Sequence, residues 1–199
     1  MKKSITLLGG NAMIDPEELA LYIYKSLSLS AKLSRKITKE SVKAAIRSQE
    51  LMYHPMWIAK LLVIADRRPF KPKMTPMMCF VDAISGYRGL MSSVPHAVQN
   101  EVEVSQIVIS HIHNEEEVKD YIKDVQHSQI NRSYALKKPE HKIVEHFLVY
   151  LPLWKVEVEG DVSEEFWINA NTGESEAYMA SLWKSEKWLR LKPANHAKA

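Results

Sequence analysis

The sequence contains a single cysteine, Cys79, and only six glycines among its 199 residues. One cysteine cannot form a disulfide within the chain, so stability must come from packing, as is usual in reducing compartments. Cys79 lies in the apolar run 77–81, where we expect a buried thiol that packs as a small hydrophobic side chain. The sequence therefore indicates neither a disulfide scaffold nor a reactive thiol.

Long hydrophobic runs are also missing. No window approaches the roughly 18 apolar residues of a membrane-spanning helix. The apolar stretch before Gly9 is only about four residues long, whereas the apolar region of a secretory signal needs roughly 7–15. We therefore expect no membrane span and a cytoplasmic location. The net charge of +3 is too small to indicate nucleic-acid binding by itself, although Lys32–Lys36 and Lys39 form a basic cluster.

Recognisable catalytic motifs are absent from the sequence. It contains no phosphate-binding Gly-rich loop, no His-Glu-x-x-His helix and no Gly-x-Ser-x-Gly elbow. His111 and His113 would lie on one face of a strand, next to the acidic run 115–117, but a third metal ligand at a diagnostic spacing is missing. We therefore predict no catalytic residues, metal or cofactor. A small enzyme with an unrecognised site remains a second alternative.

Two patterns recur in the same order along the chain. The segment 53–57, Tyr-His-Pro-Met-Trp, matches 150–154, Tyr-Leu-Pro-Leu-Trp, and 80–86, Phe-Val-Asp-Ala-Ile-Ser-Gly, matches 167–173, Trp-Ile-Asn-Ala-Asn-Thr-Gly. The offsets are 97 and 87 residues, so the first copy carries ten extra residues between its motifs. The Pro- and Lys-rich stretch 67–76 would hold them in a connection, since proline is unfavourable inside a sheet.

The second motif predicts a strand that enters a tight turn. The Asp or Asn side chain can accept hydrogen bonds from the following backbone, and we expect Gly86 and Gly173 to adopt positive φ. Residues 154–159 alternate apolar and charged residues, which predicts a strand with one wet face; Gly160-Asp161 would turn it into a strand at 165–168. We expect a further strand over 174–179.

Helical sequence precedes each hairpin. Asp15-Pro16 begins one predicted helix, and Asn114 with Glu117 resembles a capping box at the start of another. A further helix is predicted over 39–52. The helix after Asp15 has an apolar stripe of Leu19, Tyr22, Ile23 and Leu27. The helix after Asn114 has an apolar stripe of Val118, Tyr121, Ile122 and Val125.

These elements predict an α+β fold with an internal duplication of a helix-plus-antiparallel-hairpin unit, whose helices pack on one face of the sheet. The expected division is a first repeat at 1–95, a second at 96–185 and a C-terminal tail at 186–199. Whether the repeats share one sheet, and whether the chain forms oligomers, is left open by the sequence.

The second hairpin resembles the PepSY domain. The resemblance rests on Trp154 to Val158 and on the run 166–174, Phe-Trp-Ile-Asn-Ala-Asn-Thr-Gly-Glu, with a looser match at 80–86. PepSY strands commonly end in Asp-Ala-x-Thr-Gly-Glu, where this chain has Asn169. The resemblance implies a non-catalytic fold with inhibitory, chaperone-like or regulatory roles.

Candidate binding residues come from two kinds of segment. Aromatic residues around the two proline motifs could line a groove for a peptide, or pack in the core. Loops found only in the first copy combine arginine with aromatics, which suits anionic or peptide recognition. The predicted binding set is Tyr53, Trp57, Arg67, Arg68, Phe70, Tyr87, Arg88, Tyr150 and Trp154. We therefore predict a non-catalytic binding or regulatory module that recognises a protein or peptide through a sheet face or through the loops of the first copy. The first alternative is nucleic-acid binding by segment 32–39 with Arg47, Arg67 and Arg68.

Overall fold

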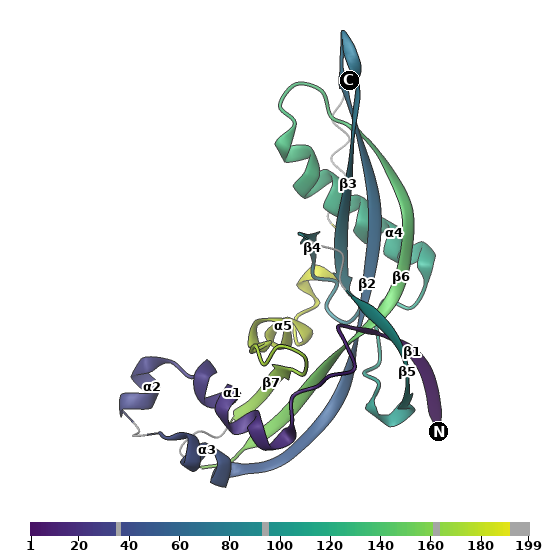
Figure 1. Cartoon of the computed structure of the whole chain (residues 1–199). Coiled ribbons are helices and arrows are strands. Elements are labelled where there is room, and N and C mark those ends of the chain that lie inside the picture. The colour runs from purple at the N-terminus through teal and green to yellow at the C-terminus, as the bar shows by residue number, and fades with distance from the viewer. Residues whose placement is uncertain (35–36, 93–95, 161–163, 192–199) are drawn as a thin grey trace. The chain divides into compact units, whose positions relative to one another are not determined.

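A computed structural model describes residues 1–34, 37–92, 96–160 and 164–191. It contains helices and a mixed sheet, so the predicted α+β class is confirmed (Figure 1). The strands are β1 (Lys2–Leu8), β2 (Ile46–Arg67), β3 (Phe70–Asp82), β4 (Arg88–Met91), β5 (Ala97–Glu103), β6 (Glu140–Val158) and β7 (Glu164–Asn169). The α-helices are α1 (Leu19–Ser26), α2 (Leu29–Ser34), α3 (Lys39–Ala45), α4 (Glu115–Val125) and α5 (Ala177–Trp183).

Short helical turns complete the described part of the chain. They are η1 (Pro16–Glu18), η2 (Val104–Gln106), η3 (Gln126–Ile130), η4 (Asn131–Ser133) and η5 (Glu186–Trp188). The strands are hydrogen-bonded in the order β4-β3-β2-β6-β1-β5, and β7 pairs with β6. Within the described residues, no helix is long and apolar enough to cross a membrane.

The chain divides into two compact units that are interleaved along the sequence. Unit 1 comprises Met1–His54, Pro95–Val108 and Tyr150–Trp183, and unit 2 comprises Pro55–Val94, Ile109–Val149 and Lys184–Ala199. This division differs from the sequential one expected at 1–95 and 96–185. Strands β2 and β6 are long enough to contribute residues to both units.

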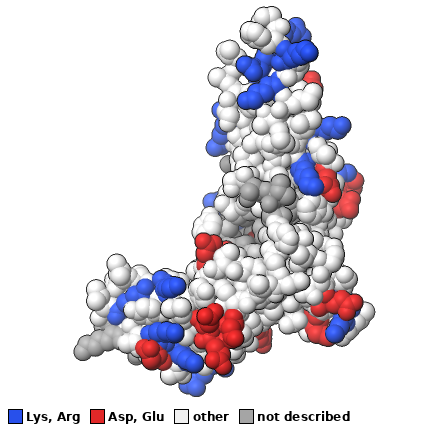
Figure 2. Space-filling model, in the orientation of Figure 1, with Lys and Arg blue, Asp and Glu red and all other residues white. Residues whose placement is uncertain are grey.

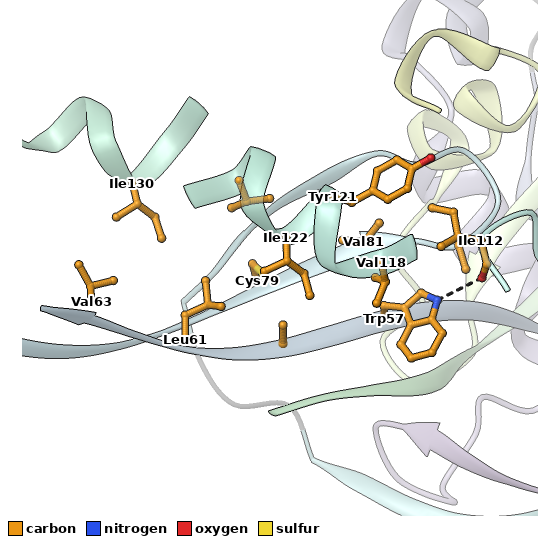
Figure 3. Close-up of a cluster of buried hydrophobic side chains, with 13 residues drawn as sticks. Trp57, Leu61, Val63, Cys79, Val81, Ile112, Val118, Tyr121, Ile122 and Ile130 are labelled. Atoms are coloured by element: carbon orange, nitrogen blue, oxygen red, sulfur yellow. Dashed lines mark hydrogen bonds between the residues drawn. The ribbon is translucent and has the colours of Figure 1, made fainter. Parts of the chain in front are cut away.

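In unit 2, helix α4 packs on the hairpin formed by β2 and β3. The helix begins at Asn114, whose side chain accepts a hydrogen bond from Glu117 N at 2.8 Å, as the capping pattern predicted. Its apolar stripe is buried against Trp57, Leu61 and Cys79 of the hairpin (Figure 3). The predicted burial of Cys79 is confirmed, and this burial raises the pKa of its thiol to about 12.

In unit 1, helix α1 packs on the hairpin formed by β6 and β7. Leu19 and Ile23 of the helix are buried in one cluster with Val156 and Ile168 of the strands. Asp15 accepts a hydrogen bond from Glu17 N at 2.8 Å and thereby caps the chain at Pro16. The N-terminal helix thus packs on the C-terminal hairpin, whereas the later helix α4 packs on the first hairpin.

Four predictions of local structure differ from the structure, the first of which concerns a helix. The helix expected over 39–52 ends at Ala45 and β2 begins at Ile46. Exposure then alternates along the strand, and Arg47 and Ser48 bond to Glu159 and Glu157 at 2.9 Å each. Cross-strand bonds of this kind override the helical pattern of the sequence.

The prediction of a strand over 174–179 was also wrong. Ser175 makes only an isolated bridge to Ile168, after which helix α5 begins at Ala177. The run Ala-Tyr-Met-Ala-Ser-Leu contains several good helix formers, which favours this outcome. His111 and His113 do not lie on a strand either. The strands at 154–159 and 165–168 are confirmed, although Asp161 of their turn lies outside the described residues.

The ten extra residues of the first hairpin lengthen its strands. The stretch 67–76 was expected to be a connection, but β3 begins at Phe70 and pairs with β2 through Thr75 and Pro76. Ala83 N donates to Pro55 O at 3.1 Å, which identifies that pair as hydrogen-bonded. Hydrogen-bonded and non-hydrogen-bonded pairs alternate along an antiparallel ladder. The backbone nitrogen of Pro76 therefore points away from β2, and its missing N–H removes no bond between the two strands. Proline is therefore tolerated in this strand.

Candidate functional site

The first of two candidate sites lies at the turn after β3. Asp82 is buried, and its Oδ1 accepts hydrogen bonds from Ile84 N at 2.8 Å and Ser85 N at 3.3 Å. Its Oδ2 accepts another from Ser85 Oγ at 2.9 Å. Gly86 then adopts φ +74°, as the sequence predicted. The turn thereby fixes the positions of the next two residues, Tyr87 and Arg88.

Arg88 is almost fully buried, with 5% of its surface exposed. Its Nε donates to Asp124 Oδ2 of α4 at 2.8 Å, and one terminal nitrogen donates to Gly86 O at 2.7 Å. The guanidinium lies 5.1 Å from the centre of the Tyr121 ring. Helix α4 and the turn itself therefore hold the predicted binding residue Arg88 in one orientation.

The same guanidinium binds the C-terminal segment of the described chain. We call residues 185–191 the Trp188 segment. Arg88 donates to Trp188 O at 2.8 Å, and the Tyr121 hydroxyl donates to Leu189 O at 3.0 Å. The Tyr87 ring meets the Trp188 ring edge-on at 5.1 Å between centroids. The predicted binding residues Tyr87 and Arg88 thus already contact a peptide segment, which is part of this chain.

Burial raises the pKa of Tyr121, and the nearby Glu117 carboxylate adds to the rise while Arg88 opposes it. Because the shift is upward from 10.0, the hydroxyl keeps its proton throughout the physiological range. It is therefore a permanent hydrogen-bond donor toward the backbone carbonyl of Leu189. We refer to Gly86, Tyr87, Arg88 and Tyr121 together as the Arg88 surface.

The second candidate site is the far end of the β2–β3 hairpin. We define the hairpin-tip surface as residues 66–74 together with 135–138, which hold six Lys or Arg residues and one acidic residue, Asp66. Figure 2 shows Lys and Arg atoms gathered over this end of the hairpin. Large apolar side chains are exposed beside them: 72% of Phe70, 64% of Met74 and all of Leu136. The surface therefore combines positive charge with accessible apolar area.

An ion pair joins the two segments of the hairpin tip. Lys137 Nζ lies 2.6 Å from Asp66 Oδ2, and Arg68 Nε lies 3.3 Å from the same oxygen. The hydrogen bond from Lys137 is the main reason that the pKa of Asp66 is lowered. Asp66 thus remains ionised and positions two of the cations, and the surrounding positive charge is left in excess.

The aromatic residues of the two proline motifs belong to the core rather than to a binding groove. Tyr53, Trp57 and Tyr150 are buried, with 5%, 5% and 6% of their surfaces exposed, and Trp154 is half-buried. Trp57 Nε1 donates to Ile112 O at 3.2 Å, and burial raises the pKa of Tyr53. Of the nine predicted binding residues, Arg67, Arg68 and Phe70 are exposed, and all three lie at the hairpin tip.

The residues of the nucleic-acid alternative are divided between the units. Arg67 and Arg68 belong to unit 2, whereas Arg47 belongs to unit 1 and pairs with Glu159 at 2.9 Å. Arg35 and Lys36 lie outside the described residues. In the part of the chain that the structure describes, no three His, Cys, Asp or Glu residues gather as a metal site would need.

Several residues of the two sites were not singled out from the sequence. Asp124 appears there as an ordinary charge on a helix, and Trp188 lies in a stretch expected to be a tail. Lys71, Lys73 and Met74 were predicted to lie in a connection. The run of cations at 67–73 was a usable signal for the hairpin tip. No local sequence pattern around Trp188 indicates that this residue contacts Arg88.

Comparison with protein-family models, curated proteins and solved structures finds no match for this chain.

Proposed function

We propose that this protein is a non-catalytic binding or regulatory module that recognises an acidic protein or peptide segment through its hairpin-tip surface. The observation that carries the proposal is the combination of six cations with exposed Phe70, Met74 and Leu136 at one end of the β2–β3 hairpin. Arginine, methionine and aromatic residues are enriched where proteins bind one another. We place this activity in the cytoplasm because a single cysteine offers no internal disulfide.

The apolar residues favour a protein partner over nucleic acid. Phe70 would stack on a base, but the aliphatic side chains of Met74 and Leu136 have no counterpart on a phosphate backbone or on a base face. An acidic segment with its own apolar residues complements both features. Pairing of a partner strand along β3 is disfavoured, because Pro76 removes an outward-facing donor and lysines lie on the same edge.

The test measures binding of fluorescent probes by anisotropy at low and high salt. An acidic decapeptide that contains phenylalanine and leucine should bind, and a basic decapeptide should not. Arg67→Glu/Arg68→Glu should weaken binding at least about tenfold, since desolvated arginines contribute strongly to interfaces. Phe70→Ser should also weaken it without changing thermal stability, because that side chain is exposed.

A matched control makes the same change of charge elsewhere. Lys39→Glu/Lys43→Glu alters two exposed lysines of helix α3 in unit 1 and should leave the affinity unchanged. Equal loss in both double variants would contradict a specific surface, since net charge alone would then explain it. Tighter binding of a single-stranded oligonucleotide, with a steep dependence on salt, would replace the proposal with the nucleic-acid alternative.

We also propose that the two units are diverged copies of one PepSY-like helix-plus-hairpin unit that have exchanged their helices. Matching hydrogen bonds support this. Trp57 Nε1 donates to Ile112 O and Trp154 Nε1 donates to Ile14 O, each at 3.2 Å. In turn, Ile112 N donates to Ala83 O at 2.9 Å and Ile14 N donates to Ala170 O at 2.7 Å.

A further inference from the structure

The Arg88 surface is held in place by contacts that do not involve the segment it binds. Asp124 and Gly86 O fix the guanidinium of Arg88 from α4 and from the turn. Tyr121 is anchored by its buried ring in the core of unit 2. The two donors aimed at the carbonyls of Trp188 and Leu189 therefore keep their positions when the segment leaves.

The contacts made by this surface are those of peptide recognition. Both hydrogen bonds go to main-chain carbonyls, which every peptide offers. A Cβ on Gly86 would lie 2.7 Å from Trp188 O, so only glycine lets the backbone approach this closely. Selectivity then comes from side chains: the Trp188 ring meets Tyr87, and Leu189 packs against the core cluster.

The Trp188 segment has the features of a short, self-contained motif. Ser185 Oγ accepts a hydrogen bond from Lys187 N at 3.3 Å, which caps the single turn Glu186–Trp188. Lys187 Nζ lies 5.6 Å from the centre of the Trp188 ring. The charged residues of the segment are exposed, while Trp188 and Leu189 are half-buried. A peptide of this sequence carries the determinants of its own turn.

We propose that the Arg88 surface is a peptide-binding site, that its ligand is a one-turn segment with tryptophan followed by an aliphatic residue, and that the chain's own Trp188 segment occupies it. A partner peptide of the same chemistry binds by displacing this segment. The tethered segment competes at a high effective concentration, in the millimolar range for short linkers, so the site is closed until the segment is released. This inference concerns a different surface from the hairpin tip and is independent of it.

The experiment uses the full chain and a labelled synthetic peptide, Ser-Glu-Lys-Trp-Leu-Arg-Leu, with the sequence of residues 185–191. Fluorescence anisotropy should show little binding to the wild-type chain. Trp188→Ala/Leu189→Ala removes the anchors of the tethered segment and should increase affinity for the peptide at least about tenfold, by removing the competitor. The same peptide with alanine in place of tryptophan should not bind.

A second variant tests whether the peptide binds at the Arg88 surface. Tyr121→Phe, combined with Trp188→Ala/Leu189→Ala, deletes one donor but keeps the buried ring, and should weaken peptide binding several-fold. Unchanged affinity would overturn the assignment of the site. No gain of binding in Trp188→Ala/Leu189→Ala would overturn the proposal itself. If that variant loses its fold, the peptide should restore its melting temperature, and failure to do so would also overturn the proposal.

Discussion

The turns that follow β3 and β7 share a backbone geometry but contact different neighbours. Asp82 and Asn169 each accept two backbone hydrogen bonds with Oδ1, and Gly86 and Gly173 have φ +74° and +77°. Gly86 lies against the backbone of the Trp188 segment, whereas Gly173 lies against the Tyr22 ring of α1. One local motif thus supports a terminal segment in unit 2 and a helix in unit 1.

The difference extends to the residues that follow the turns. In unit 2 the turn is followed by Arg88, a buried cation that binds carbonyls and Asp124. In unit 1 the turn is followed by Glu174 and Ser175, and then Glu176 accepts a hydrogen bond from Asn169. The residues after the two turns can therefore differ while the turns stay the same. We expect these divergent residues to determine function and the turns to stabilise the fold.

Replacing the tryptophans of the two proline motifs should give the largest difference in stability between the two units. Trp57→Ala is expected to lower the free energy of unfolding by about 3–5 kcal/mol, since the side chain is buried in the core of unit 2. Trp154→Ala should cost less because Trp154 is only half-buried. Urea denaturation measures the loss, and amide hydrogen exchange locates it in unit 1 or unit 2.

Phenylalanine provides the control for both positions. Trp57→Phe and Trp154→Phe keep an aromatic ring and remove the indole hydrogen bonds, so the two losses should be similar, on the order of 1 kcal/mol beyond the change in size. A larger loss for Trp154→Ala than for Trp57→Ala would show that burial does not distinguish the copies.

The turn glycines should give smaller and more nearly equal effects. Gly86→Ala and Gly173→Ala each force a side chain into a positive-φ conformation and are expected to cost roughly 1–3 kcal/mol. At Gly173 the new methyl also meets the Tyr22 ring, so Tyr22→Ala should relieve part of the loss. Thermal melts of the single and double variants measure both effects.

Gly89→Ala is the matched control for the glycine pair. Its added Cβ would lie 3.2 Å from the Phe80 ring, a side chain, and Gly89 is not among the positive-φ glycines of the described residues. The expected loss is therefore smaller than at the turns. Wild-type melting of Gly86→Ala and Gly173→Ala would remove the main support for a shared turn and for the proposed duplication.

Local patterns predicted the parts of the fold that local chemistry determines. The caps at Asp15 and Asn114, the apolar stripe of α4 and the two glycine turns depend on residues close in sequence. Which helix covers which hairpin depends on contacts far apart along the chain. Since α1 and α4 have similar apolar faces, nothing local indicated that α1 packs on β6–β7 and α4 on β2–β3.

The candidate sites were predictable to a similar extent. Arg67, Arg68 and Phe70 were found because a run of cations and prolines stands out in a sequence of mild net charge. Tyr87 and Arg88 were selected for recognition, but the sequence gave no indication of what they contact. Their partner, Trp188, is a hundred residues beyond Arg88, and no periodicity or spacing connects positions that distant.

The smallest expected effect concerns Glu176, which lies seven residues after Asn169; the residue seven positions after Asp82 in the other copy is Gly89. Burial raises the pKa of Glu176 in the folded chain; Glu174 adds to the rise, whereas Asn169 and His54 oppose it. A raised folded pKa means that protonation of Glu176 stabilises the fold. This contribution is present below the ordinary value of 4.5 and is lost as the pH rises through the folded pKa.

Glu176→Gln should therefore become more stable relative to the wild-type chain as the pH rises from about 4 to about 7, because glutamine is neutral throughout. Urea midpoints at both values measure the effect, with Glu164→Gln, at the exposed start of β7, as a control for loss of one negative charge. The difference between wild type and Glu176→Gln should be localised by amide exchange to unit 1, which contains Glu176. A difference that shrinks with rising pH, or one equal to that of Glu164→Gln, would mean that the carboxyl after the unit 1 turn ionises without penalty, and burial of this carboxyl would then not distinguish the two turns.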